Sequence, residues 1–309
     1  MLPIIPRVSG AQTFPTRAVR LIVGYAPGGA TDITARLLAQ SLSTRFGQQF
    51  VVENRPGAAT NIATGEVVRT PPDGYTLLMA TAANAINSSL YGQLSFDFLR
   101  DLDMVAGIIK MQNVLEVHPS VPARTVSELV AYAKDNPTKL TFGSAGIGSP
   151  GHVSGELFKM MTGIRMAHVP YRGVAPALSD LIAGHIHVLI DNMATAIEHI
   201  RTGAVRALAV TTATRSTLLP ELPTINETIA GYDASSWFGV SAPKGTPKDV
   251  IEVLNRAVNA TLDEPSIAER FEKLGGAPMP GSSADFQRFV VEETDKWGRV
   301  IQFAGAKAE

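Results

Sequence analysis

Cysteine is absent from the 309-residue sequence. Its absence excludes disulfides, thiolate metal ligands and thiol nucleophiles, and it leaves the redox compartment open. An excess of charge is missing too, because 27 Lys and Arg balance 28 Asp and Glu, and no Lys- or Arg-rich run occurs. We therefore expect neither a nucleic acid nor an anionic membrane surface as a partner. The sequence also lacks any run near the roughly 20 apolar residues of a membrane span.

Common catalytic and metal-binding signatures are missing as well. The sequence has no G-x-S-x-G nucleophile elbow, no Walker A loop and no H-E-x-x-H pair. His185 and His187 share one face of a predicted strand, which permits a metal site, but no third ligand of suitable spacing is evident. Because no acid–base or nucleophile–base pair is in view, we predict a protein that is not an enzyme and that carries neither metal nor cofactor.

The length of the chain indicates its organisation. At 309 residues it exceeds the usual limit of about 250 residues for one hydrophobic core, which predicts two domains. Short β-rich runs alternate with helical patterns, and such alternation predicts parallel sheets with helices on both faces. We expect strands at 19–23, 50–53, 76–79, 114–117, 140–143, 166–169, 186–190, 207–210 and 237–242.

The most informative stretch is Tyr25-Ala26-Pro27-Gly28-Gly29-Ala30-Thr31-Asp32, which joins the first predicted strand to an amphipathic helix. A glycine-rich turn from strand to helix leaves the first backbone N–H groups of the helix free to bind an anion. The Thr31 and Asp32 side chains can cap this helix, which we expect to end at Gly47. Two interpretations stay open: an anion site, or a helix cap without further function.

Three later loops also follow predicted strands. In open α/β sheets ligands bind beyond the carboxyl ends of the strands, and the loops at 143–152, 171–176 and 191–193 lie at such ends. The first is rich in glycine and leads into another helix, and its His152 can either donate to a ligand or stabilise the loop. Two helix N-termini, one in each half of the chain, could face one another across a cleft.

Gly146, Gly148 and Gly151 also match the G-x-G-x-x-G fingerprint of dinucleotide sites. The acidic residue expected at the ribose is missing, with Arg172 nearest its place, and Pro150 stiffens the turn. A glycine-rich loop of another use is therefore the preferred interpretation. An NADP-linked oxidoreductase, in which an arginine binds the 2′-phosphate, stays as the alternative.

Seven motifs in one order, between Arg17 and Phe303, carry a resemblance to a known family. The sequence resembles the substrate-binding receptors of the tripartite tricarboxylate transporter system, the Bug receptor family. A single motif would be weak evidence, whereas seven over nearly the whole chain are specific. They are Ala26-Pro27-Gly28-Gly29-Ala30-Thr31-Asp32, Glu53-Asn54-Arg55-Pro56-Gly57, Pro72-Asp73-Gly74-Tyr75-Thr76, Ala85-Ile86-Asn87, Gly143-Ser144-Ala145-Gly146, His168-Val169-Pro170-Tyr171-Arg172-Gly173 and Ser236-Trp237-Phe238-Gly239.

The resemblance implies an α/β protein of two domains, each a sheet flanked by helices, that closes on its ligand like a type II periplasmic binding protein. Domain 1 would hold residues 1–107 and 236–309, and domain 2 residues 108–235. The implied function is capture of a small organic mono- or dicarboxylate and its delivery to membrane permease subunits. The implied location is the periplasm, with Ser9-Gly10-Ala11 as a trace of an export signal. We expect a monomer, and sensing without transport stays an alternative.

The same resemblance assigns ligand contacts by position. One carboxylate of the ligand would be gripped, partly through water, by Gly28, Gly29, Ala30, Thr31 and Asp32 on one side and by Ser144, Gly148 and Ser149 on the other. His152 belongs to the second of these loops. The far end of the ligand would meet Tyr25, Thr81, Asn84, Tyr171, Arg172 and Asn192, with Ala59 and Thr60 at the rim.

Two carboxylates among the predicted ligand-binding residues need a separate explanation, since an anion repels an anionic ligand. We expect Asp32 to orient a bridging water or to cap its helix, and Asp191 to order its loop or to read a donor on the ligand. The chain also departs from the family pattern at Ala59 and Thr60, where two glycines are usual. Side chains there would narrow the rim of the cleft.

Overall fold

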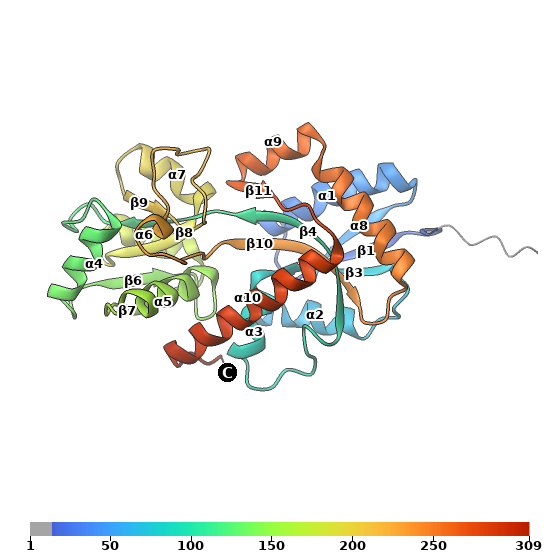
Figure 1. The fold of residues 1–309 in the computed structure, drawn as a ribbon, viewed down its shortest axis with the longest axis horizontal. Helices are drawn as coiled ribbons and strands as arrows, with labels where there is room; N and C mark the ends of the chain where they lie inside the picture. The colour runs from blue at the N-terminus through green and yellow to red at the C-terminus, as the bar shows by residue number, and fades with distance from the viewer. Residues whose placement is uncertain (1–13, 309) are drawn as a thin grey trace, which may run out of the picture.

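Two β-sheets flanked by helices make up the protein, as Figure 1 shows for a computed structural model that describes residues 14–308. One sheet has six strands in the order β11-β4-β10-β3-β1-β2, and the other has five in the order β7-β6-β8-β5-β9. The expectation of a two-sheet α/β fold is thus confirmed. The Ser9-Gly10-Ala11 prediction lies outside the described residues.

The bounds of the elements follow the predicted alternation closely. The strands are β1 (Val19–Val23), β2 (Phe50–Asn54), β3 (Thr76–Thr81), β4 (Leu102–Met111), β5 (Asn113–Val117), β6 (Thr141–Ser144), β7 (Ala167–Pro170), β8 (Val188–Asn192), β9 (Arg206–Val210), β10 (Ser236–Pro243) and β11 (Gly276–Pro278). The helices are α1 (Ala30–Phe46), α2 (Asn61–Val68), α3 (Ala82–Leu90), α4 (Val126–Asp135), α5 (Pro150–Thr162), α6 (Val174–Ile182), α7 (Met193–Arg201), α8 (Lys248–Leu262), α9 (Pro265–Lys273) and α10 (Ser283–Ala304). Among residues 14–308 no helix has the length and apolar character needed to cross a membrane.

The expectation of purely parallel sheets is wrong. The strands β1, β2 and β3 pair in parallel, as do β6, β7 and β8. In contrast, β10 runs antiparallel to β3 and β4, and β5 runs antiparallel to β8 and β9. Parallel neighbours in a sheet need a crossover connection, usually a helix. The chain instead passes from one sheet to the other through β4 and β5 and returns through β10, so these strands have no such connection to their neighbours and pair antiparallel.

The strands β4 and β11 were not expected from the sequence. All but two residues of β4 are buried, so it shows little of the alternation that marks a half-exposed strand. It also continues into β5 after the single residue Gln112, without a helix or turn to separate the two. The strand β11 has only three residues, too few to give a pattern.

The chain passes between the sheets twice, and the two crossings are hydrogen-bonded to each other. The Thr211 N–H donates to the Asn113 carbonyl at 2.9 Å, and the Ala234 N–H donates to the Thr211 carbonyl at 3.0 Å. The Asn113 side chain adds a bond from Nδ2 to the Ala234 carbonyl at 3.3 Å. The chain therefore leaves the six-stranded sheet at Gln112 and re-enters it at the start of β10. The domain limits at 107/108 and 235/236 stay a prediction.

The C-terminal helix α10 joins both halves of the molecule by packing on α3 and α5 (Figure 1). Its buried Glu293 carboxylate accepts hydrogen bonds from the indole nitrogens of Trp237 at 3.1 Å and Trp297 at 3.0 Å. Lys296 on the same helix donates to the Asp233 carbonyl, next to the second crossing, at 3.0 Å. Trp237 is fully buried, so its role here is packing between β10 and α10.

Glu116 on β5 is fully buried, and among residues 14–308 neither of its carboxylate oxygens has a hydrogen-bond partner. Its strand partner Leu189 and the adjacent same-face residue Val114 are apolar and fully buried. Burial raises the pKa of Glu116 well above its usual 4.5, and the nearby Asp191 raises it further. Folding therefore favours the protonated form of this carboxyl.

With the substitution Glu116→Gln, the free energy of unfolding is expected to decrease less steeply as the pH rises. In the unfolded chain the carboxyl ionises near pH 4.5, whereas the folded protein retains the proton to higher pH. The stabilising contribution is therefore present below that pH and is lost as the pH rises through the folded pKa. Urea midpoints across this range measure the slope, with Glu198→Gln, whose side chain is 73% exposed, as the control. Equal slopes for Glu116→Gln and the wild-type chain would contradict the prediction.

Candidate functional site

The loops of interest in the six-stranded sheet lie at the carboxyl ends of three parallel strands. Val23, the last residue of β1, pairs with Asn54 at the end of β2 and with Met79 near the end of β3. The register therefore brings the loop after β1, the Asn54 side chain and Thr81 to one edge of the sheet. This edge is where the sequence predicted one side of the site.

Asp32 is 2% exposed and is surrounded by donors from its own half of the molecule. Its carboxylate accepts hydrogen bonds from the Gly28 N–H, from Arg36 Nε and from Asn54 Nδ2, each at 2.9 Å. Burial works against the charged form, but the bonds from Arg36, Gly28 and Asn54 outweigh it and lower the pKa of Asp32. Asp32 is therefore a fixed anion that folds the loop.

The predicted side-chain cap of α1 by Thr31 or Asp32 is wrong. The N-cap residue is Gly29, and no side chain caps the helix there, because Asp32 lies in the first turn and bonds back to Gly28 instead. Gly28 and Gly29 are exposed. The N–H groups of Gly29, Ala30 and Thr31 have no acceptor among residues 14–308. The predicted end of the helix at Gly47, in the left-handed region with φ 63°, is confirmed.

Asn84 and Thr81 form the start of α3 at the same edge. The Asn84 amide donates from Nδ2 to the hydroxyls of Thr60 at 3.1 Å and Thr64 at 2.8 Å, and its oxygen accepts from the Thr81 N–H at 2.8 Å. Tyr25 lies beside them, where burial raises its pKa and a hydrogen bond with Thr81 opposes the rise. Asn84 thus has internal partners on both sides of its amide and supports the loops.

The glycine-rich loop of the five-stranded sheet runs from β6 to α5 and is held by two histidines. The Ser144 hydroxyl lies 2.7 Å from His168 Nε2 and accepts from the Gly146 N–H at 3.1 Å. The Gly148 N–H donates to His152 Nδ1 at 3.1 Å. Ser149 is the N-cap residue of α5. His152, of which only 4% is exposed, therefore stabilises the loop, and the Gly148 N–H already has an acceptor.

Both histidines are uncharged at neutral pH. Burial and, to a smaller extent, the charge of Lys159 lower the pKa of His152 to about 4. Burial lowers the pKa of His168 to about 3, with added effects of His152 and Lys159. Their rings stack with centroids 4.1 Å apart. Because His152 Nδ1 accepts from Gly148, its ring proton lies on Nε2.

Close packing accounts for two glycines of the apparent dinucleotide fingerprint. A Cβ atom at Gly151 would lie 2.5 Å from the Ile190 carbonyl oxygen, and one at Gly148 would lie 2.2 Å from Leu90 Cδ2. The second contact is between the halves, since Leu90 ends α3 beside the six-stranded sheet. The loop from Ser144 to Ser149 therefore lies against α3, whereas its joint grip on a ligand with Gly28 to Asp32 stays a prediction.

The remaining predicted residues lie at the ends of β7 and β8. The Tyr171 hydroxyl donates to Asp180 at 2.7 Å, and burial raises the pKa of Tyr171 to about 12. Arg172 is exposed. Asp191 is 6% exposed; one oxygen accepts from the Asn192 N–H at 2.6 Å, and the other has no partner among the described residues. Burial raises the pKa of Asp191 to about 6.

The possible histidine metal site has no support in the geometry. His185 pairs with Asp180 at 3.2 Å, while His187 bonds to Thr141 at 3.0 Å. Within residues 14–308 no group of three His, Cys, Asp or Glu side chains could hold a metal ion.

The comparisons with known proteins agree with this architecture. Residues 34–306 match the family described as tripartite tricarboxylate transporter family receptor. The chain belongs to this receptor family. It is 37% identical to protein BugT of Bordetella pertussis over 302 residues, which cover 96% of this chain and 92% of that protein.

Solved structures of other receptors show the same fold. The chain is similar to R. palustris Rpa4515 with adipate, with 42% identity, a TM-score of 0.82 and coverage of 95% of this chain and 99% of that one. It is also similar to MatC (Rpa3494) from Rhodopseudomonas palustris with bound malate, with 29% identity, a TM-score of 0.77 and coverage of 93% and 100%. These receptors are similar along almost the whole chain.

Asn54 and His168, each of which holds a candidate loop, were not predicted as site residues from the sequence. Both residues are part of the seven motifs; Asn54 ends β2, whereas His168 is the second residue of β7. A polar residue that ends a strand beside a glycine-rich loop is the signal that could have found Asn54, and His168 has no such local signal.

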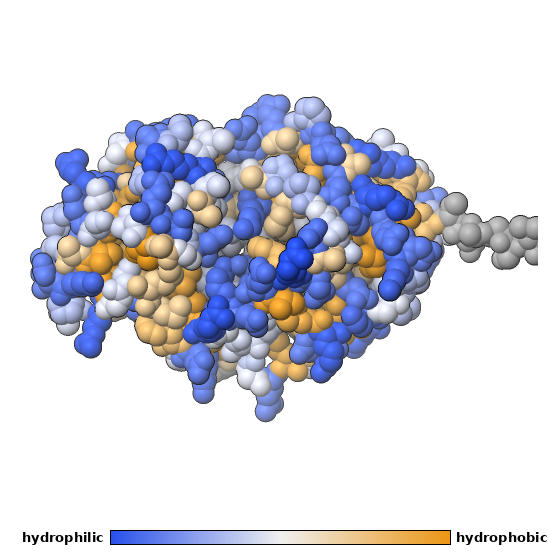
Figure 2. Space-filling view, in the orientation of Figure 1, coloured by the Kyte–Doolittle hydropathy of each residue, from blue (hydrophilic) through white to orange (hydrophobic). Residues whose placement is uncertain are grey.

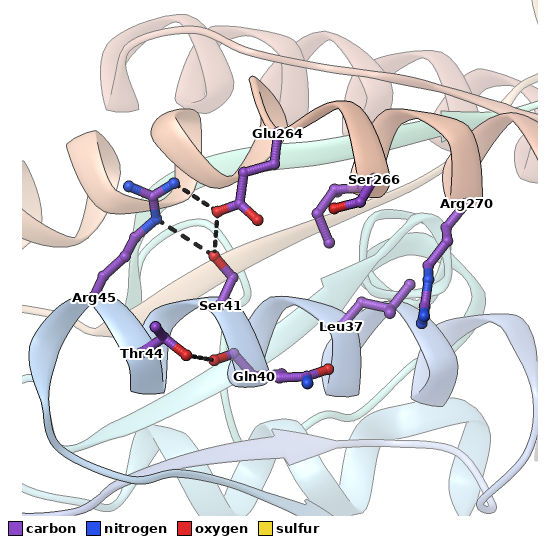
Figure 3. Close-up of a pocket in the computed structure, with 9 residues that line it drawn as sticks. Leu37, Gln40, Ser41, Thr44, Arg45, Glu264, Ser266 and Arg270 are labelled. Carbon is purple, nitrogen blue, oxygen red and sulfur yellow. Dashed lines mark hydrogen bonds and ion pairs between the residues drawn. The ribbon is translucent and has the colours of Figure 1, made fainter.

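One hollow of this receptor, about 430 Å³ in volume, lies apart from the strand ends, between α1 and the start of α9 (Figure 3). Arg45 and Glu264 face one another across it, with their guanidinium and carboxylate atoms 2.6 Å apart, and Ser41 donates to the same carboxylate at 2.7 Å. The charge of Arg45 is thus compensated inside the protein.

Asp32→Ala is expected to reduce the free energy of unfolding by about 1–3 kcal/mol, because it removes the hydrogen bonds from the Gly28 N–H and from Asn54 Nδ2 to the carboxylate and leaves Asn54 Nδ2 with the Tyr25 carbonyl alone. Arg36→Ala removes only one partner, whose side chain is 53% exposed, and should cost less than about 1 kcal/mol. Urea unfolding at neutral pH measures both values. Equal losses would show that the ion pair, and not the loop, accounts for the burial of Asp32.

Proposed function

We propose that this receptor binds a small organic carboxylate outside the cytoplasm, closes on it about a hinge, and delivers it to the permease of a tripartite tricarboxylate transporter. Membership of the receptor family supports the class of function. The names of two similar structures include adipate and malate, which supports a carboxylate as the ligand. The observation that carries the proposal is the exposed turn at Gly28 and Gly29, where a helix begins without a side-chain cap.

A carboxylate at this turn would accept hydrogen bonds from the N–H groups of Gly29, Ala30 and Thr31. Each charge-assisted bond contributes about 1.5–3 kcal/mol, so three could support micromolar affinity, about −8 kcal/mol, after ordering costs. The nearby charge of Asp32 is compensated by Arg36 and Asn54. The positive end of α1 therefore remains available to the ligand.

The other half of the molecule would complete the grip. Ser144 and Ser149 are the predicted contacts there, and His168 and His152 hold their loop. Closure would bend the two hydrogen-bonded crossings near Asn113, with α10 as a third connection. Tyr171, Arg172, Asp191 and Asn192 would meet the far end of the ligand, and the unpartnered oxygen of Asp191 suits a donor on it.

The location in the periplasm and the monomeric state belong to this proposal. Sensing without transport uses the same site and stays an alternative function. The NADP-linked alternative has less support, since packing explains Gly148 and Gly151.

Addition of the right carboxylate is expected to raise the melting temperature by a few degrees, because a ligand at 100 times its Kd stabilises by about 2.7 kcal/mol. Differential scanning fluorimetry with mono-, di- and tricarboxylates and NADPH tests this. If only NADPH shifts the melting temperature, the receptor function is wrong for this chain.

Gly29→Leu locates the site in the same assay. Gly29 has φ −81° and open space around the position of a Cβ atom, so the variant should fold. Its side chain would cover the N-terminus of α1 and abolish the ligand shift. Gly92→Leu, which also meets no atom within 4 Å, is the matched control and should keep the shift. If Gly29→Leu kept the full ligand-induced shift in melting temperature, the ligand would not bind at this turn.

A further inference from the structure

The turn between β2 and α2 has a backbone conformation that side chains rarely adopt. Ala58, Ala59 and Thr60 follow one another with φ 46°, 49° and 80°, and they are the only non-glycine residues among 14–308 with positive φ. Each is strained relative to glycine, and such strain is typical of functional sites. Three strained residues in succession therefore need an explanation.

Packing explains Thr60 but not the two alanines. Thr60 is 1% exposed, its hydroxyl accepts from Asn84, and it packs so closely on Gly24 that a Cβ atom there would lie 2.6 Å from Thr60 Cβ. Ala58 and Ala59 are exposed. Glycine would fit their backbone with less strain, so packing in the core does not account for the two methyl groups.

Beneath the turn lies a pair of asparagines with unused hydrogen-bonding capacity. Asn87, 1% exposed, donates from Nδ2 to the Ala59 carbonyl at 2.6 Å and to Asn61 Oδ1 at 3.0 Å. Asn87 Oδ1 and Asn61 Nδ2 are buried and have no partner among the described residues. The pair thus has one acceptor and one donor without a hydrogen bond. A buried polar group without a hydrogen bond lowers the stability of the folded protein.

The pair lies close to the candidate ligand loops. Gly24, which Thr60 contacts, directly precedes Tyr25. Leu90, one turn along α3 from Asn87, is the residue that approaches Gly148 of the opposite loop. The turn therefore contacts the segment that leads into the loop before α1, and α3 connects Asn87 to the opposite loop.

The charges near the turn do not favour a second carboxylate. Arg55 is paired with Glu53 at 2.7 Å and Glu66 at 3.2 Å, and Arg20 pairs with the same two carboxylates at 2.8 and 2.9 Å. The unpartnered Asn87 Oδ1 is an acceptor that would repel an anion.

We propose that the turn from Gly57 to Asn61, together with Asn87, is a subsite for an uncharged hydroxyl or carboxamide at the end of the ligand remote from its carboxylate. The proposal rests on the receptor function above. A hydroxyl or carboxamide both donates and accepts, which matches Asn87 Oδ1 and Asn61 Nδ2. The group reaches these atoms as the turn shifts, and relief of backbone strain favours that shift, while Ala58 and Ala59 restrict the size of the group that enters.

A matched ligand series tests the chemical class. Isothermal titration calorimetry compares a straight-chain monocarboxylate, its ω-hydroxy acid, its ω-carboxamide and the dicarboxylate of equal length, over a range of chain lengths. We expect the hydroxy acid or the carboxamide to bind at least about tenfold more tightly than the dicarboxylate. Binding of dicarboxylates as tight as the best neutral-ended ligand would overturn the subsite and leave the receptor function standing. Absence of binding by every carboxylate would refute both.

Two variants test the residues. Asn61→Asp keeps the oxygen that Asn87 uses and replaces the free donor with an acceptor, so it should weaken the carboxamide about tenfold more than the plain monocarboxylate. Asn226→Asp, which keeps its bond from the Gly231 N–H, controls for added charge. The double variant Ala58→Gly/Ala59→Gly should melt at a higher temperature without ligand and lose the selectivity. A higher melting temperature with unchanged selectivity would contradict the role of the two methyl groups.

Discussion

The hydrogen bonds that tie the two chain crossings together are the constraint on which the rest of the structure depends. Asn113 begins the second sheet one residue after the first crossing, and Thr211 and Ala234 bind to it and to each other at the second. Because the strands of both sheets meet at this junction, the hydrogen bonds between the crossings fix where the loops of one sheet lie relative to those of the other. The helix α10 spans the same boundary with buried tryptophans.

In both candidate loops a buried side chain binds a backbone N–H group and so fixes the shape of the loop. Asp32 bends the loop after β1 by binding the Gly28 N–H, and His152 does the same for Gly148. Both residues are buried, so neither the charge of Asp32 nor the ring of His152 is exposed at the surface. Such an arrangement would suit the proposed carboxylate ligand, since backbone dipoles attract an anion without a desolvated cation beside it.

A few buried polar side chains lack hydrogen-bond partners among the described residues, which lowers the stability of the folded protein. Among residues 14–308, the buried Glu116 carboxyl has no hydrogen-bond partner, one Asp191 oxygen has none, and Asn87 and Asn61 have an unpaired acceptor and donor. Asp191, Asn61 and Asn87 adjoin the candidate ligand loops, where a bound molecule can supply the missing partner. Glu116 lies within the apolar core, and nothing in the structure explains its side chain there.

The sequence by itself determined the alternation of strands and helices, the family and the loops at the strand ends, because glycine-rich turns, apolar periodicity and ordered motifs are local signals. It predicted Gly47 as a helix end for the same reason. The tertiary structure alone decided that β10 returns antiparallel, that β4 exists and that His152 and Asn84 support loops. Strand direction, side-chain packing and many hydrogen-bond partners depend on residues far apart in the chain, such as Gly148 packed on Leu90 or Asn84 bonded to Thr60, and no local pattern encodes those approaches.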